Sequence, residues 1–377
     1  MTNGDLLIKS IEESDYFPLN FDELELAVKD KIDIGPYSYV RSGAGGEETL
    51  RNNRQAFEKY AIIPRFLNDV STIDTSIEIF GKTHPTPLLF APVGMNKIAH
   101  EDGERAVIRS ASKLGIPYIQ STVASYSMEE LAAEAPDHTK WFQLYWSSNK
   151  EVAYSMVERA EKAGFEAIVL TIDTVTLGWR EHDIRNQFSP LLKGFASGNY
   201  KSDPVFMASL KDDSVEAFVE AQIANIYHPQ LNWAHVRELK QRTQLPVLLK
   251  GVLHPEDARL AIEAGIDGII VSNHGGRQLD GVIASLDALP TVAEEVAGRI
   301  PVIFDSGVYR GIDVLKALAL GANAVAIGRP FVYGLAYAGE LGVKRAMQNI
   351  YNEFEVSMKL AGVSNIAALR NLHLVKK

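Results

Sequence analysis

A histidine and an arginine stand three residues apart at the end of one short apolar stretch. The stretch covers residues 268–273 and is followed by His274, two glycines and Arg277. An imidazole is suited to taking a proton near neutral pH, and a guanidinium can hold a carboxylate through two parallel hydrogen bonds. The pair therefore suits a small anionic substrate that loses a proton. A loop-capping histidine and a surface ion pair are the plainer interpretation of this fragment, so the rest of the chain must decide.

Length and composition limit the kinds of protein that the chain can be. At 377 residues it can form two ordinary domains or one large α/β barrel. The hydrophobic share of 46% is typical of a soluble globular protein, and no apolar run approaches the ~20 residues of a membrane span. A net charge of −10 disfavours nucleic acid and acidic membrane as partners. Without cysteine or a secretory signal, we expect no disulfides, no metal site and a cytoplasmic location.

From residue 87 onward, apolar runs alternate with amphipathic helical patterns. We expect strands at residues 88–92, 118–121, 141–145, 167–173, 247–250, 268–273, 302–305 and 324–328. We expect helices at residues 104–114, 127–135, 151–163, 233–242, 255–264 and 312–320. Eight strand–helix units in a row predict a (β/α)8 barrel. A doubly wound sheet is the alternative, weakened because no early glycine-rich turn between a strand and a helix marks a dinucleotide site.

Three segments lie outside the regular alternation, within what we expect to be one domain over residues 1–377. Residues 1–86 predict N-terminal helices and a hairpin, and residues 331–377 predict C-terminal helices. The gap at residues 174–245 is far longer than a typical connection, and such inserts in barrels are usually lids or disordered segments. Residues 42–48 are rich in glycine but follow no predicted strand, so they lack the context of a phosphate fingerprint.

In a barrel, the active site lies at the carboxyl ends of the strands. The predicted strand ends, with the loops just after them, carry polar side chains: Gln143, Tyr145, Thr171, Asp173, Arg180, Lys250, His274, Arg277, Asp305 and Arg329. The loops after the last two strands also carry glycines, which let backbone amides approach a phosphate. A phosphorylated cofactor is therefore expected. Lys250 suits either a Schiff base or the stabilisation of a reduced flavin, and its spacing does not separate these alternatives.

The motifs resemble the FMN-dependent L-2-hydroxy acid oxidases and dehydrogenases, a family that includes glycolate oxidase, lactate oxidase, mandelate dehydrogenase and lactate 2-monooxygenase. The resemblance runs from about residue 37 to the C-terminus and rests on residues 42–45, 170–174, 177–181, 272–280 and 305–307. It implies FMN as the cofactor, with a small 2-hydroxy carboxylate and O2 as reactants. It also implies a homo-oligomer, often a tetramer.

The resemblance further implies a role for each site residue. His274 is the base, with Asp173 as its hydrogen-bonding partner. The substrate carboxylate is held by Arg277 and Arg180 with help from Tyr39, and Tyr145 hydrogen-bonds in the substrate pocket. The residues implied in contact with FMN are Pro92, Val93, Gly94, Ser121, Gln143, Thr171, Lys250 and Ser272. Its phosphate is expected on the loop from Asp305 through Gly307, Tyr309 and Arg310, and on Gly328 and Arg329.

Two positions depart from the commonest family pattern. Tyr309 stands where many members have arginine, so one phosphate cation is missing or is supplied by Arg310. An arginine at position 309 is then expected to slow the loss of FMN. Gly94 stands where several oxidases of short substrates carry alanine, which predicts extra room beside the substrate's side chain. The insert is most similar to that of the lactate 2-monooxygenase branch.

Together these features predict FMN-dependent oxidation of an L-2-hydroxy acid, with L-lactate favoured and O2 as the acceptor. Release of acetate, carbon dioxide and water is slightly favoured over release of pyruvate and hydrogen peroxide, because of the insert. A dehydrogenase with another acceptor is a third outcome. Hydride transfer and carbanion formation stay open, since both need the same base and clamp. The rival interpretations are an FMN-dependent isomerase of isopentenyl diphosphate and a non-enzymatic FMN-binding protein.

Overall fold

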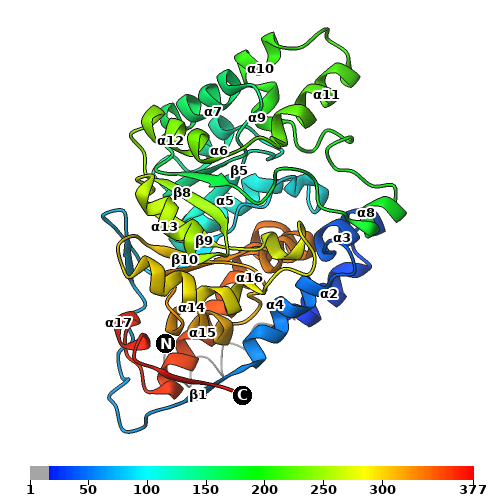
Figure 1. The fold of residues 1–377 in the computed structure, drawn as a ribbon. Helices are drawn as coiled ribbons and strands as arrows, with labels where there is room; N and C mark the ends of the chain where they lie inside the picture. The colour runs from blue at the N-terminus through cyan, green and yellow to red at the C-terminus, as the bar shows by residue number, and fades with distance from the viewer. Residues whose placement is uncertain (1–16) are drawn as a thin grey trace.

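A computed structural model describes residues 17–377 and shows a closed barrel of eight parallel strands (Figure 1). The strands are β4 (Leu88–Phe90), β5 (Tyr118–Ser121), β6 (Lys140–Leu144), β7 (Ile168–Thr171), β8 (Val247–Val252), β9 (Gly268–Val271), β10 (Val302–Phe304) and β11 (Ala324–Ile327). Each strand pairs with its neighbour in the chain, and β11 pairs with β4 to close the ring. The predicted (β/α)8 barrel is confirmed.

The strands are apolar on both faces because the barrel has an inner and an outer core. Alternate side chains fill the interior, which holds Leu89, Ile119, Trp141, Val169, Leu248, Ile270, Ile303 and Ala326. The hairpin of β2 (Ile77–Ile79) and β3 (Lys82–His84) closes one end of this interior, with Phe80 5.6 Å from Trp141 between ring centroids. The predicted hairpin is therefore present, and it leaves the opposite end of the barrel for a site.

Eight helices pack around the barrel: α5 (Gly103–Leu114), α6 (Met128–Glu134), α7 (Lys150–Lys162), α12 (Trp233–Arg242), α13 (Pro255–Glu263), α14 (Ser285–Val296), α15 (Gly311–Ala319) and α16 (Arg329–Ala361). The six predicted barrel helices are all present, and no end differs from its prediction by more than one residue. Helix α6 begins with a capping box formed by Ser127 and Glu130. Helix α14 was not predicted, because Pro290 interrupts its pattern.

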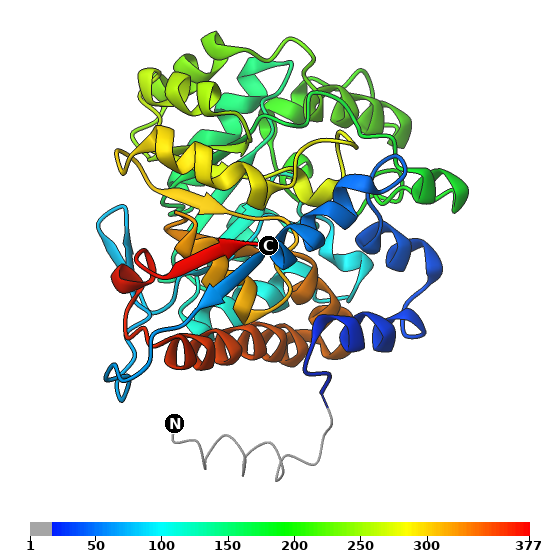
Figure 2. The ribbon, with the colours of Figure 1, turned by 60° about the horizontal axis from the view of Figure 1, so that its bottom comes forward.

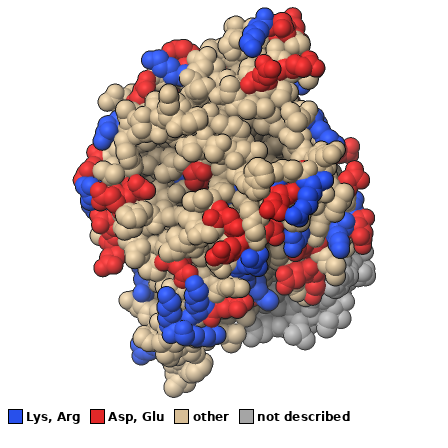
Figure 3. All heavy atoms as spheres, turned by 45° about the vertical axis from the view of Figure 1, so that its right-hand side comes forward, with Lys and Arg blue, Asp and Glu red and all other residues tan. Residues whose placement is uncertain are grey.

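The N-terminal segment contributes α2 (Phe21–Lys29), α3 (Ile34–Arg41) and α4 (Glu48–Glu58); the part predicted before residue 17 lies outside the described residues. Strand β1 (Tyr60–Ile63) pairs antiparallel with β12 (His373–Lys376), which follows α17 (Ile366–Leu369) (Figure 2). Within residues 17–377, no helix is long and apolar enough to cross a bilayer. Acidic and basic side chains are mixed over the face in Figure 3.

The insert folds into α8 (Glu181–Arg185), α9 (Gly198–Lys201), α10 (Pro204–Ala208) and α11 (Val215–Ile226). It is tied to the barrel by polar contacts. Arg159 on α7 donates to the Asn199 carbonyl at 2.9 Å and to Asp203 at 2.9 Å. The backbone N–H of Met128 donates to the Asn199 side chain at 2.8 Å. The insert is therefore packed structure around short helices, and it extends the wall above the carboxyl ends of the strands.

The start of α15 packs without a gap on α16. A Cβ added at Gly311 would lie 2.1 Å from the Phe354 nitrogen and 2.5 Å from the Ile350 oxygen. We expect Gly311→Ala to lower the free energy of unfolding by about 1–3 kcal/mol, as overpacking does, and to lower the melting temperature. The matched control is Gly46→Ala, whose Cβ would meet nothing closer than 3.8 Å. Equal melting temperatures for the two variants would contradict this packing.

Candidate active site

A cavity opens at the carboxyl ends of the strands, where the sequence predicts the site. Its lining includes Tyr39, Tyr145, Arg180, Lys250, His274 and Arg277. It also includes Pro92, Val93, Gly94 and Ser121, together with Asp305, Gly307, Tyr309, Gly328 and Arg329. Asp173, Gln143, Thr171 and Ser272 lie behind this lining, and Arg310 points elsewhere. The structure thus brings most of the predicted residues to one cavity.

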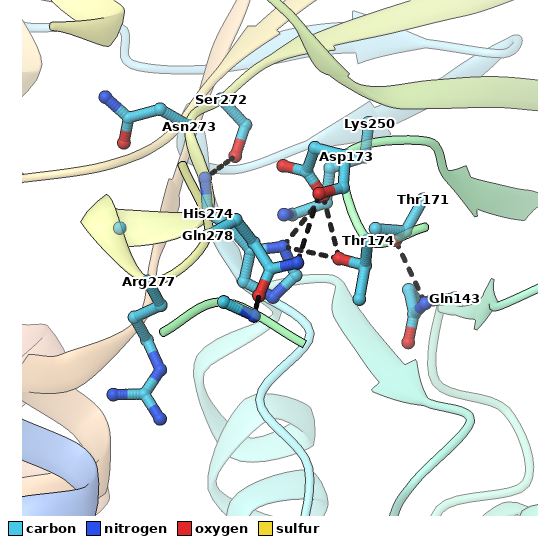
Figure 4. A network of polar contacts seen from close by, with 12 residues as sticks. Gln143, Thr171, Asp173, Thr174, Lys250, Ser272, Asn273, His274, Arg277 and Gln278 are labelled. Atoms are coloured by element: carbon cyan, nitrogen blue, oxygen red, sulfur yellow. Dashed lines mark hydrogen bonds and ion pairs between the residues drawn. The ribbon is translucent and has the colours of Figure 1, made fainter. Parts of the chain in front are cut away.

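His274 lies in the short 3-10 helix η2 (His274–Gly276), directly after β9. Its Nδ1 is 2.8 Å from Asp173 Oδ1 and 3.3 Å from the Thr174 hydroxyl, which itself donates to Asp173 at 3.1 Å. Figure 4 shows these three side chains pointing toward one another. Because Nδ1 is occupied, Nε2 is the nitrogen left for a ligand in the cavity.

Burial and charge set the protonation of this pair. Burial lowers the pKa of His274 below its ordinary value, and the nearby Lys250 lowers it further, against the opposing charge of Asp173. Burial opposes ionisation of Asp173, but the positive charges of His274 and Lys250 outweigh it and lower its pKa to about 2. At neutral pH the site therefore holds a neutral imidazole beside an ionised carboxylate, as a general base requires.

Two guanidinium groups, those of Arg277 and Arg180, line the cavity near the ring of Tyr39. Arg277 Nη1 donates to the carbonyls of Tyr39 at 2.6 Å and Ser42 at 2.7 Å, while Arg180 donates to the Arg277 carbonyl at 3.2 Å. Among residues 17–377, the buried Nη2 of Arg277 has no hydrogen-bond partner. Burial and the neighbouring charge of Arg180 lower the pKa of Arg277 to about 10. An unpaired N–H on one guanidinium, with the charge of a second guanidinium nearby, is suited to an anionic ligand.

The insert supplies residues that the sequence analysis missed. Leu191, Ile226 and Tyr227 line the cavity. Asp183 faces Arg277 and Arg180, and burial raises its pKa. Its only sequence signal is a position three residues after Arg180, one helical turn along the chain. The carbonyl of Trp179, an indole 69% exposed, accepts from the Gly45 N–H at 2.7 Å and so ties this segment to the N-terminal region.

A chain of polar contacts crosses the three neighbouring strands β5, β6 and β7. Ser121 donates to Gln143 at 3.1 Å, and Gln143 donates to Thr171 at 2.9 Å. Ser272 accepts from the His274 N–H at 3.0 Å. Gln143, Thr171 and Ser272 are all buried, so their hydrogen bonds fix one another and the strand ends. Lys250 is buried as well, with its Nζ 3.9 Å from Asp305.

The loop after β10 has the geometry of an anion site. Ser306 and Gly307 adopt left-handed φ values of 84° and 78°, and a Cβ at Gly307 would lie 2.8 Å from the Asn53 carbonyl oxygen. Within the described chain, the N–H groups of Gly307 and Val308 have no protein acceptor. Unclaimed amides in such a turn are suited to a phosphate. The guanidinium of Arg329 donates to three carbonyls, those of Val40, Ser42 and Gly275.

Two expectations from the sequence are corrected by this geometry. Arg310 does not supply a phosphate cation, because its Nε lies 3.1 Å from Glu353 on α16 and its side chain lies outside the cavity lining. The room expected at Gly94 is filled: an added Cβ would lie 2.6 Å from Val123 Cγ2 and 2.7 Å from the Val123 oxygen. Both outcomes depend on which way a side chain points: that of Arg310 lies against Glu353, and that of Val123 lies against Gly94. The sequence pattern does not encode these directions.

The residues present therefore fit a flavin with a phosphate. The cavity is lined by a loop with unpaired amides, by small residues, by a buried lysine and by a neutral base. Beyond the base, the arginine pair leaves a place for a small carboxylate.

Comparison with known proteins agrees with this geometry. Residues 28–376 match the FMN-dependent dehydrogenase family model. The chain is 67% identical over 375 residues to an L-lactate oxidase of Lysinibacillus sphaericus, covering 100% of this chain and 97% of that protein. It is 43% identical to glycolate oxidase 3 of Arabidopsis thaliana, covering 94% and 95% of the two chains. A crystal structure of mandelate oxidase superposes with a TM-score of 0.85 at 38% identity, covering 96% and 99%.

Matches of this extent confirm the resemblance seen in the sequence, and with it the cofactor. The chain belongs to the FMN-dependent dehydrogenase family, and it is an FMN-dependent 2-hydroxy acid oxidoreductase.

Proposed function

We propose that the enzyme oxidises L-lactate with O2 and releases pyruvate and hydrogen peroxide. The observation that carries the proposal is the neutral His274, held by Asp173, beside the unpaired N–H of Arg277. The name of the relative at 67% identity, an L-lactate oxidase, supports lactate as the substrate. Val123 fills the space beside Gly94 where a methyl group would lie, so the glycine adds no room there for a longer substrate side chain.

In this proposal the arginine pair binds the lactate carboxylate, with Tyr39 under the guanidinium of Arg277 at 4.6 Å from ring centroid to Cζ. Tyr145, whose pKa is raised by burial, stays protonated and can donate a hydrogen bond to the substrate. His274 Nε2 accepts the proton of the hydroxyl, and the resulting imidazolium is stabilised by the Asp173 carboxylate. FMN, when bound, supplies the two-electron acceptor that passes electrons to O2.

Decarboxylation of pyruvate to acetate inside the cavity is the second candidate. It is favoured by the three insert residues that line the cavity, Leu191, Ile226 and Tyr227, since a closed insert can retain pyruvate. The name of the lactate oxidase relative favours release, and we give that more weight. The homotetramer and the cytoplasmic location expected from the sequence stay predictions.

Product analysis with excess catalase tests the proposal. Catalase destroys released peroxide before it can decarboxylate pyruvate in solution. We expect one pyruvate per lactate, half of the consumed O2 returned, and no more acetate than in a blank of pyruvate with catalase. Acetate and carbon dioxide formed in equal amounts to lactate despite catalase would contradict release and establish the monooxygenase. No flavin reduction by L-lactate without oxygen would contradict both.

A second prediction concerns the base. His274→Ala is expected to lower the rate of flavin reduction by about 10²- to 10⁴-fold, as loss of a general base does. In the wild type, kcat/KM should fall on acidification through the lowered pKa of His274, because imidazolium cannot accept the proton. Asp173→Asn removes the charge that raises this pKa, so the acid limb should move to still lower pH. A limb that moves upward, or does not move, would argue against this pairing.

A third prediction concerns the carboxylate clamp. Arg277→Lys is expected to reduce kcat/KM for L-lactate by about ten- to a hundred-fold, because an ammonium group cannot replace the planar guanidinium that spans two carbonyls and the ligand. Arg185→Lys is the control, since Arg185 is exposed on α8 and pairs with Glu181. Steady-state kinetics on both variants checks the assignment. A harmless Arg277→Lys change would place the clamp elsewhere.

A further inference from the structure

The ring of Tyr309 is held from outside the barrel. Phe21 of α2 stacks on it with ring centroids 3.7 Å apart and planes 15° apart. The guanidinium of Arg54, on α4, lies 4.7 Å from the same ring centroid. Since Phe21 covers one face at contact distance, the other face is left to Arg54. Tyr309 is therefore enclosed between two residues that are more than 250 positions away in the chain.

The backbone beside Tyr309 is held by one buried carboxylate. Asp313 Oδ2 accepts from the N–H groups of Tyr309 and Arg310, each at 3.0 Å, and from Arg54 Nη1 at 2.6 Å. Arg54 Nη1 also donates to the Gly307 carbonyl. Arg54 thus joins the start of the loop to its end, with its charge balanced by Asp313, which is only 2% exposed.

Helix α2 is in turn fixed to the C-terminal helix. It packs against α16, where Phe21 lies 5.4 Å from the Tyr333 ring and Glu25 accepts from the Tyr333 hydroxyl at 3.0 Å. In Figure 2 the helices of the N-terminal segment lie outside the barrel. Neither Phe21 nor Arg54 lines the cavity, whereas Tyr309 does. The contact therefore runs from the outer surface to the loop with the unclaimed amides.

We propose that Phe21, Arg54 and Tyr309 form a clasp that holds the loop after β10 in the conformation that receives the FMN phosphate, so that α2 sets how long FMN stays bound. Phe21 and Arg54 are positioning residues in this proposal. The inference rests on FMN as the cofactor and is independent of which 2-hydroxy acid is oxidised.

The physical reason is the cost of the loop's conformation. Ser306 is a non-glycine residue with a left-handed φ of 84°, which surrounding contacts must hold in place. If α2 is released from Tyr309, the loop can relax, and the amides of Gly307 and Val308 no longer converge. The clasp also gives Tyr309 a role other than a lost cation. An arginine there gives up the ring stack and puts a second guanidinium beside Arg54. The clasp therefore predicts that Tyr309→Arg speeds FMN loss, which is the opposite of the expectation from the sequence.

The test is the rate of FMN release from the holoenzyme, followed by flavin fluorescence after dilution. Phe21→Leu keeps an apolar side chain and removes the stack, so release should become roughly two- to ten-fold faster, the size of an aromatic pair contact. Phe165→Leu is the matched control, because it removes an aromatic contact with Phe142 on another part of the barrel. Its release rate should equal that of the wild type.

A second readout separates the clasp from general loss of stability. Riboflavin lacks the phosphate, so its affinity for the apoprotein should be the same in Phe21→Leu and wild type, while FMN affinity falls. Tyr309→Phe keeps the ring, so its FMN release should equal that of the wild type. Tyr309→Leu removes the ring, so its FMN release should be faster. This pair of variants also tests the proposal if Phe21→Leu folds poorly. Unchanged FMN release in both Phe21→Leu and Tyr309→Leu would overturn the proposal. Equal weakening of riboflavin binding and FMN binding in Phe21→Leu would also overturn it.

Discussion

Two half-buried guanidinium groups, those of Arg277 and Arg329, form the constraint on which the rest of the site depends. Solvent reaches them only in part, so backbone carbonyls from distant segments converge on them. Arg277 and Arg329 share the Ser42 carbonyl at 2.7 Å and 3.0 Å. The N-terminal segment, the loop after β9 and the start of α16 thus meet at one atom. Loss of the Ser42 carbonyl from this position would take one acceptor from each of the two cations.

The charge of Lys250 acts on two neighbouring groups at once. Its ammonium group lowers the pKa of His274 and also helps to lower that of Asp173. One buried cation thus favours a proton-free imidazole and, at the same time, an ionised partner for it. Asp305, 3.9 Å away, offers Lys250 a counter-charge that does not touch the base. The order of charges along the strand ends therefore sets both protonation states.

Much of the fold could be predicted because its signals are local. Strands and barrel helices follow from apolar runs and helical periodicity, and the rim residues follow from where those runs end. Helix α14 was missed because Pro290 lies within it and proline normally ends a helix. In the folded protein, packing keeps this helix continuous. The pairing of β1 with β12 and the stack of Phe21 on Tyr309 join residues 288 to 316 positions apart, for which a single sequence carries no signal. Arg310 and Gly94 failed for a related reason: whether a charge or a gap faces the cavity depends on neighbours from other elements.

The exposed position of the Trp179 indole has a practical consequence for spectroscopy. The chain has four tryptophans, of which Trp141 and Trp146 are buried and Trp233 is half-buried. Trp179 is 69% exposed and directly precedes Arg180. Its indole emission should therefore respond to solvent quenchers far more than the others do, and any displacement of the Arg180 segment changes its surroundings. The protein carries an intrinsic optical reporter next to Arg180, one of the two arginines proposed to bind the substrate carboxylate. Movement there can be followed in stopped-flow experiments without attaching a dye.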